Sequence, residues 1–107
     1  MKDLYVSLLG DIYGNLLTDK QRNIVRDYYD RDLSLSEIAE AHGITRQAAL
    51  DAVRTGENTL KKYESALGFA EKFRRISEYV SEIEKLLGNG DCSGAEAATK
   101  ELEALLI

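Results

Sequence analysis

The segment 33–60 constrains the fold of this chain more than any other stretch. It contains two helix starts, at Ser34 and Thr45, and each offers a hydroxyl side chain that can cap a helix N-terminus. Gly43 lies between them, where a left-handed backbone ends one helix and turns the chain into the next. Two helices joined by so tight a turn predict a helix-turn-helix motif, whose second helix is the one that enters the major groove of DNA.

Apolar and small residues occupy the positions where this motif needs its core. Ile38 and Val53 are apolar, and Ala39 is small at the point where the two helices cross. Two positions fit the motif less well, because His42 stands where an apolar residue is usual and Ala49 is small for an anchor of the second helix. The pattern still favours a helix-turn-helix over two ordinary packed helices.

The composition indicates an all-α fold. The chain has 107 residues and no Pro, so helices with short connections are expected. No apolar run approaches the ~18 residues of a membrane helix. The N-terminal segment 1–11 is too short and too acidic to be a secretory signal. We therefore expect a cytoplasmic protein without membrane insertion.

Apolar residues at helical spacing predict six helices. The first covers residues 2–13, with an inward stripe of Leu4, Leu8 and Ile12 that Tyr5 and Leu9 widen. At the starts of three others, a hydroxyl residue is followed three positions later by Gln or Glu, and such capping boxes fix helix N-termini. These pairs are Thr18 with Gln21, Ser34 with Glu37 and Ser93 with Glu96.

The fourth helix defines the predicted domain organisation. It starts at Thr45 and is expected to run unbroken to the end of a helix-turn-helix domain, residues 1–67, as a long linking helix. Residues 68–107 are expected to form a C-terminal helical hairpin. Gly56 lies on the apolar seam of the long helix, which indicates close approach of another backbone, and a local kink is the other interpretation.

The face of the fourth helix opposite this seam carries side chains suited to nucleic acid. Arg pairs with guanine, Gln with adenine, and Leu contacts the thymine methyl group, while basic residues further along reach phosphates. Asp51 opposes this reading because phosphate repels its carboxylate, and a solvated face is the alternative. The predicted nucleic-acid-binding residues are Thr45, Arg46, Gln47, Leu50, Arg54, Lys61 and Lys62.

The charge distribution limits how such a face can bind. The net charge is −5, and most of it lies in residues 69–107, which carry 5 basic and 8 acidic side chains. Nucleic-acid-binding proteins are usually basic on at least one face. The acidity therefore argues against tight, non-specific binding to phosphates, and leaves room for a local basic strip.

The C-terminal hairpin carries an apolar seam that two small helices cannot bury on both sides. Its steps of four and three residues are typical of a helical core or a coiled coil. We expect a homodimer interface here, and a core within one monomer is the alternative. The predicted interface residues are Phe69, Phe73, Ile76, Val80 and Ile83.

Catalytic, metal and cofactor sites are not predicted. His42 and Cys92 are the only residues of their kinds, and two isolated ligands cannot make a zinc site. The Gly-rich segment 88–94 has no Gly-Lys-Ser/Thr sequence and so is not a phosphate loop, and we expect it to be a turn that exposes Cys92. The chain is therefore expected to be no enzyme, with no cofactor and no small-molecule substrate.

Several segments of residues 3–75 carry a resemblance to known proteins. They are LTDKQR at 17–22 with Leu16 before it, Tyr28-Tyr29, LSLSEIA at 33–39, GITRQA at 43–48, Tyr63-Glu64, Leu67-Gly68 and Glu71-Lys72-Phe73. In general pattern they resemble region 4 of bacterial sigma factors. In detail they are similar to the YlxM family of small bacterial helix-turn-helix proteins, from which Ala49, Leu50 and Gly56 depart.

The resemblance implies a dimeric bacterial protein of the cytoplasm that regulates the signal recognition particle pathway. It supplies no catalytic residues. DNA is the expected target of the motif, and the RNA of the particle is a second candidate. The competing hypothesis is an interaction protein, in which the helix-turn-helix is a scaffold and the acidic hairpin binds protein components of the targeting machinery.

Overall fold

The computed structural model describes residues 2–106, and all of the secondary structure in that range is helical, which confirms the all-α prediction. The chain divides into two units, Met1–Gly68 and Phe69–Ile107. None of the helices described in residues 2–106 combines the length and apolarity that crossing a membrane requires.

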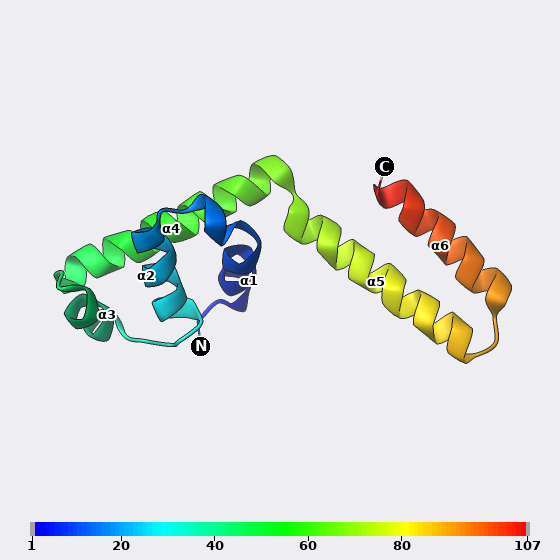
Figure 1. Cartoon of the computed structure of the whole chain (residues 1–107), viewed down its shortest axis with the longest axis horizontal. Coiled ribbons are helices and arrows are strands. Elements are labelled where there is room, and N and C mark those ends of the chain that lie inside the picture. Colours follow the sequence, from blue (N-terminus) through cyan, green and yellow to red (C-terminus); the bar gives the residue numbers. More distant parts are fainter. Residues whose placement is uncertain (1, 107) are drawn as a thin grey trace. The chain divides into compact units, whose positions relative to one another are not determined.

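The N-terminal unit is built on one long helix. Figure 1 shows α1, α2 and α3 beneath α4, and all three contact it. A single-turn 3-10 helix, η1, follows α1. The elements are α1 (Leu4–Tyr13), η1 (Gly14–Leu16), α2 (Asp19–Tyr29), α3 (Leu35–His42) and α4 (Arg46–Leu67).

Two of the predicted capping boxes fix the starts of α2 and α3. Thr18 Oγ1 accepts from the Gln21 backbone N–H at 3.2 Å, and the Gln21 side chain accepts from the Thr18 N–H at 3.3 Å. Ser34 and Glu37 make the same reciprocal pair, both at 3.1 Å. Each box satisfies two backbone donors that a helix start leaves free, so these boundaries follow directly from sequence.

The predicted helix-turn-helix is present between α3 and α4. Gly43 has a φ of 65°, and the N–H of Ile44 donates to the carbonyl of Ala39 at 3.0 Å, which closes the end of α3. Ala49 is fully buried although it is small. The core of the motif consists of Ile24, Ile38, Ala39, Ala49 and Val53.

The orientation of α1 differs from the predicted one. Asp3 caps the helix, and Val6, Leu9 and Tyr13 are the buried residues. Leu4 and Leu8, expected to face inward, are 71% and 46% exposed, so the prediction is wrong for these two residues. This short helix carries two apolar stripes, and the contacts of Tyr13 determine which of them is buried. Its ring packs on Tyr63, and its hydroxyl donates to Glu64 Oε1 at 2.6 Å, both on α4.

The long helix runs unbroken through Gly56, as predicted. Gly56 is buried against α2, and a methyl group at this position would collide with Cγ2 of Val25. The absence of a side chain therefore lets α2 approach the backbone of α4. Gly68 ends the helix with a φ of 66°, and its N–H donates to the carbonyl of Glu64 at 2.8 Å.

The second unit is a helical hairpin of α5 (Phe69–Gly88) and α6 (Cys92–Leu106), antiparallel as predicted (Figure 1). The predicted capping box at Ser93 is wrong. Asp91 caps α6 instead, because its carboxylate accepts from the Gly94 N–H at 2.8 Å, and a Cβ on Gly94 would meet that carboxylate. Cys92 is exposed as predicted, but it lies in the first turn of α6 and not in the connecting turn.

Candidate nucleic-acid interface

The N-terminal half of α4 is held firmly at its start and along its inner side. Thr45 caps the helix, and its hydroxyl accepts from the Ala48 N–H at 3.0 Å. Ala49 and Val53 anchor the first two turns in the core of the motif. A helix fixed in this way presents the side chains of its outer face in a defined order, which base recognition requires.

The outer face carries most of the predicted contact residues together. Arg46, Gln47, Arg54 and Lys62 are exposed, and Leu50 is half-buried. No ion pair joins Arg46, Arg54 or Lys62 to an acid in the part of the chain that the structure describes. These three cations remain available to an anionic partner.

Gln47 and Asp51 form a pair on the same face. Gln47 Nε2 donates to Asp51 Oδ1 at 3.0 Å, one helical turn further along. Because a carboxylate only accepts hydrogen bonds, this contact fixes which end of the Gln47 amide faces Asp51. The oxygen of the amide then points to other partners.

Lys61 is part of a second polar network, which joins α4 to α2. Its ammonium donates to Glu57 Oε1 at 2.8 Å, and the Tyr29 hydroxyl donates to Glu57 Oε2 at 2.7 Å. The hydrogen bond from Lys61, with the one from Tyr29, lowers the pKa of Glu57, and the same pairing raises the pKa of Lys61. Burial and the bond to Glu57 raise the pKa of Tyr29. Glu57 therefore partly compensates the charge of Lys61. In residues 2–106 no acid compensates Arg46 or Arg54 in this way.

A buried carboxylate near the turn was not predicted from the sequence. Asp27 on α2 is only 5% exposed. Its two oxygens contact Nε2 of His42 at 2.8 Å and Nη1 of Arg31 at 2.6 Å. The contact of His42 with Asp27 joins the end of α3 to α2. This contact explains why a polar residue stands at a position that is usually apolar. The signals in the sequence were the unusual His42 itself and the i,i+4 spacing of Asp27 and Arg31.

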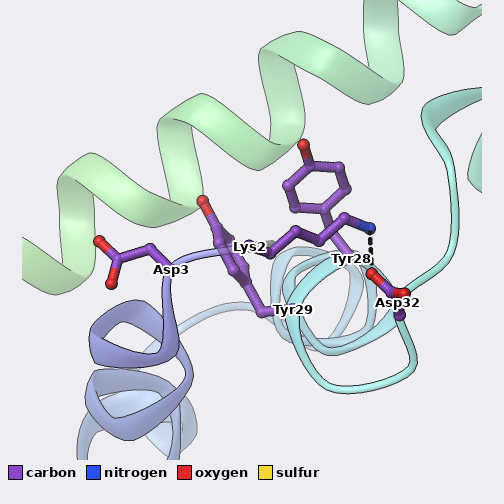
Figure 2. Close-up of a pocket in the computed structure, with 5 residues that line it drawn as sticks. All are labelled: Lys2, Asp3, Tyr28, Tyr29 and Asp32. Atoms are coloured by element: carbon purple, nitrogen blue, oxygen red, sulfur yellow. Dashed lines mark ion pairs between the residues drawn. The ribbon is translucent and has the colours of Figure 1, made fainter.

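An open hollow of about 490 Å³ lies where the N-terminal segment meets α2 (Figure 2). The ammonium of Lys2 sits 3.8 Å from the ring centroid of Tyr28 and 3.4 Å from Asp32 Oδ1. Tyr29 and Asp3 complete the lining. The contacts of Lys2 with the ring of Tyr28 and the carboxylate of Asp32 hold the N-terminal segment against α2. Lys2 is the cation among the lining residues, and because it is already paired the hollow does not suit an anion.

One face of α5 carries an apolar stripe that is only partly buried. Phe69, Phe73 and Val80 are 42%, 49% and 43% exposed, and Ile76 and Ile83 are half-buried. The first two rings stack with their centroids 6.1 Å apart. The predicted interface residues thus share one face of the helix.

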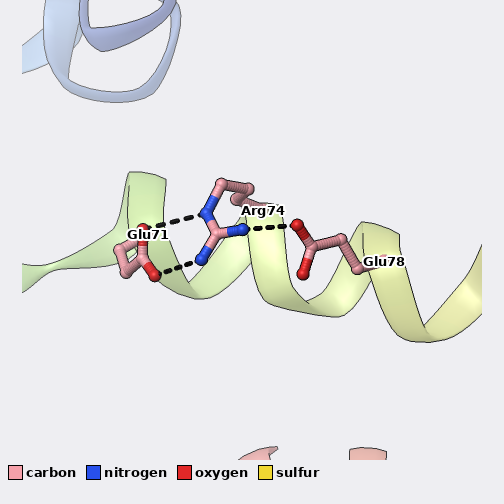
Figure 3. Close-up of polar contacts among 3 residues, drawn as sticks. All are labelled: Glu71, Arg74 and Glu78. Atoms are coloured by element: carbon pink, nitrogen blue, oxygen red, sulfur yellow. Dashed lines mark hydrogen bonds and ion pairs between the residues drawn. The ribbon is translucent and has the colours of Figure 1, made fainter.

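Arg74 lies between two acids on the same helix (Figure 3). Its guanidinium donates to both oxygens of Glu71, at 2.6 and 3.0 Å, and also to Glu78. The hydrogen bonds from Arg74 lower the pKa of Glu71 and raise that of the arginine. The charge of Arg74 is therefore compensated by two acids of its own helix.

Comparison with known proteins gives one consistent result. A family model described as "Putative helix-turn-helix protein, YlxM / p13 like", UPF0122, matches residues 1–98. The chain is 41% identical to a UPF0122 protein of Symbiobacterium thermophilum over 97% of this chain and 98% of that protein. It is 39% identical to one of Desulforamulus reducens over 99% and 92%, and 43% identical to one of Clostridium acetobutylicum over 78% and 72%.

Proposed function

Because the chain belongs to the UPF0122 family of YlxM / p13-like helix-turn-helix proteins, we propose that it is a cytoplasmic regulatory protein that binds duplex DNA through the N-terminal half of α4. One observation carries the proposal. Arg46, Gln47 and Arg54 are exposed on one face of a helix that a glycine turn and buried Ala49 hold in place.

The positions along α4 suggest how the contacts divide. Arg46 and Gln47 lie in the first turn after the cap, which is the part of a recognition helix that reaches base edges. Arg54 and Lys62 lie further along, where side chains reach phosphates, and Lys61 contributes less because Glu57 holds it. So few phosphate contacts in an acidic chain imply that binding is weak without the base contacts.

A titration of the full chain against a random pool of duplexes, at low and at moderate salt, tests this proposal. We expect binding at low salt that weakens as salt rises, and Arg54→Ala should reduce the slope of log affinity against log salt by about 1. Arg46→Ala should reduce the sequence preference, because one of the two residues expected to contact bases is lost. Arg75→Ala on α5 is the matched control and should change neither property. Absence of binding at low salt would overturn the proposal.

We further propose that the protein is a homodimer, joined through the stripe of α5. The hairpin buries few large side chains of its own, and the stripe is continuous over the length of α5. Two-fold symmetry would also give two copies of the recognition helix, which suits pseudo-palindromic sites. Sedimentation of the full chain over a range of concentrations tests the dimer, and a monomer at all of them would contradict it.

A second candidate function is protein binding within the signal recognition particle pathway, which the family resemblance implies. The exposed Leu4 and Leu8 on α1 favour it, because uncovered apolar side chains on one helix face suit a protein partner. Binding to the protein subunit of the particle would be insensitive to salt and lost in Leu8→Glu. Binding to the RNA of the particle would instead fall steeply with salt.

A further inference from the structure

We propose that Asp51 is a positioning residue, which holds the Gln47 amide so that Gln47 reads an adenine in the major groove. This inference rests on the proposed function and adds to it the base that one position of the site requires. It gives Asp51 a role on a face where its negative charge would otherwise only oppose binding.

The geometry fixes the orientation of the Gln47 amide. Nε2 of Gln47 donates to Asp51 Oδ1 at 3.0 Å, and the carboxylate cannot bond to the amide oxygen. One N–H of the amide is used by Asp51, so the other N–H and Oε1 remain. These two groups are what adenine needs, because its major-groove edge offers the acceptor N7 and the N6 amino donor side by side.

The surroundings of Asp51 favour this role over an electrostatic one. Asp51 is exposed, and Gln47 is the partner that the structure gives it in residues 2–106. Arg54, three residues further on, makes no ion pair with it in residues 2–106. A carboxylate that neutralises no cation and would be repelled by phosphate does not strengthen binding by its charge. Its remaining contribution is the hydrogen bond to Gln47.

Holding Gln47 in place also has an entropic effect. The side chain of Gln has three rotatable bonds, and an exposed one samples many conformations before it binds. A hydrogen bond that restricts these conformations in the free protein reduces the entropy lost on binding. Asp51 thus favours adenine over the other bases at that position without contacting DNA.

The test measures base preference separately from affinity. A preferred site is selected from a random duplex pool with the full chain. All single-base variants of the site are then titrated at low salt against the wild type, Gln47→Ala, Asp51→Ala, Asp51→Asn and the double variant Gln47→Ala/Asp51→Ala. Circular dichroism and thermal melting confirm that each variant is folded.

We expect one position at which the wild type prefers adenine by about tenfold, as a bidentate Gln contact provides. Gln47→Ala and Asp51→Ala should both remove this preference, and the double variant should match Gln47→Ala. Asp51→Ala should bind the sequences that lack this adenine at least as tightly as before, because a negative charge is lost. Asp51→Asn should keep the preference, because its amide oxygen still accepts from Gln47.

An adenine preference that survives in Asp51→Ala would overturn this inference and leave the proposed function intact. The same holds if Asp51→Asn loses the preference as fully as Asp51→Ala does. No binding of the wild type to any duplex would overturn both the proposed function and this inference. The two failures are therefore distinguishable.

Discussion

The two units of the chain differ in how completely they bury their large apolar side chains. The N-terminal unit encloses large side chains completely, among them Leu9, Ile24 and Leu60. In the described part of the hairpin, the buried residues are three alanines, Ala70, Ala95 and Ala98, while Phe73 and Leu87 stay about half exposed. A fully buried Leu or Ile contributes about 1.5–3 kcal/mol, and an alanine far less. The first unit therefore has its own core, and the described part of the hairpin buries no comparable set of large side chains.

The largest expected effect tests this contrast directly with two leucines. Leu60→Ala removes a side chain that is fully buried, and should cost about 2–5 kcal/mol of the free energy of unfolding. Leu87→Ala removes one that is 55% exposed, and should cost about 0.5 kcal/mol while the chain is monomeric. Chemical denaturation at low protein concentration measures both. Equal costs at that concentration would show that the hairpin has a core of its own.

The second prediction concerns the stripe of α5. Val80→Glu places a charge at the centre of the proposed dimer interface, and should raise the dimer dissociation constant by about 100-fold or more, because a buried charge without a partner is costly. Ser81→Glu, the next residue on the helix, lies off the stripe and is the matched control. Sedimentation of the full chain measures both. If the two variants dimerise equally, the stripe is not the interface.

The third prediction compares two helical glycines in the N-terminal unit. Gly56→Ala gains about 1 kcal/mol of helix propensity and loses about 1–3 kcal/mol through overpacking against Val25, so it should destabilise the unit. At Gly10 a Cβ meets no atom within 4 Å, so Gly10→Ala should be neutral or stabilising. Thermal melting measures both. A Gly56→Ala variant as stable as the wild type would mean that α2 yields without cost.

These glycines also show how far the sequence predicts the fold. Gly56 on an apolar seam predicted close packing, and the capping boxes at Thr18 and Ser34 predicted two helix starts, because each signal is local. The face of α1 was not predictable in this way. Its burial depends on Tyr13 reaching Glu64, which is 51 positions away. Contacts of that separation leave no periodic signal in one sequence.

The candidate site could likewise be predicted only in part from the sequence. The helix and its exposed face, including Arg46 and Arg54, could be predicted because they follow from turn chemistry and helical spacing. The bond from Tyr29 to Glu57 and the pair of His42 with Asp27 each join two helices. Such pairs form only when the core brings the helices together, so helical spacing alone predicted neither.

The fourth prediction concerns a polar contact of the N-terminal unit. Tyr29→Phe removes the hydrogen bond to Glu57, and should cost at most about 1 kcal/mol at neutral pH, since the pair is partly exposed. Burial raises the pKa of Tyr29 above its ordinary 10.0. The stability that the neutral phenol contributes is therefore present below pH 10 and is lost as pH rises through the raised value.

The deficit of Tyr29→Phe against the wild type should accordingly shrink above pH 10, in denaturation curves measured at several pH values. Tyr28→Phe is the matched control, because Tyr28 is the neighbouring tyrosine of α2. A constant deficit across the alkaline range would contradict the proposed linkage.

The smallest effect is expected in the hairpin, at the contacts of Arg74. Its hydrogen bonds lower the pKa of Glu71, so Arg74→Ala should return that pKa towards the ordinary 4.5, as a titration followed by NMR would show. The contribution of this pair is present above pH 4.5 and is lost as pH falls through the lowered pKa. Arg75→Ala is the control and should shift the pKa of Glu71 less, because its effect on that carboxyl is purely Coulombic.

Arg74→Ala should leave the melting temperature of the full chain almost unchanged at physiological salt, because exposed ion pairs are screened by solvent and ions. A large fall in melting temperature would mean that surface charges, and not an apolar interface, hold the hairpin together. An unchanged melting temperature with a clear shift in the pKa of Glu71 would show that this pair contributes little to the stability of the hairpin.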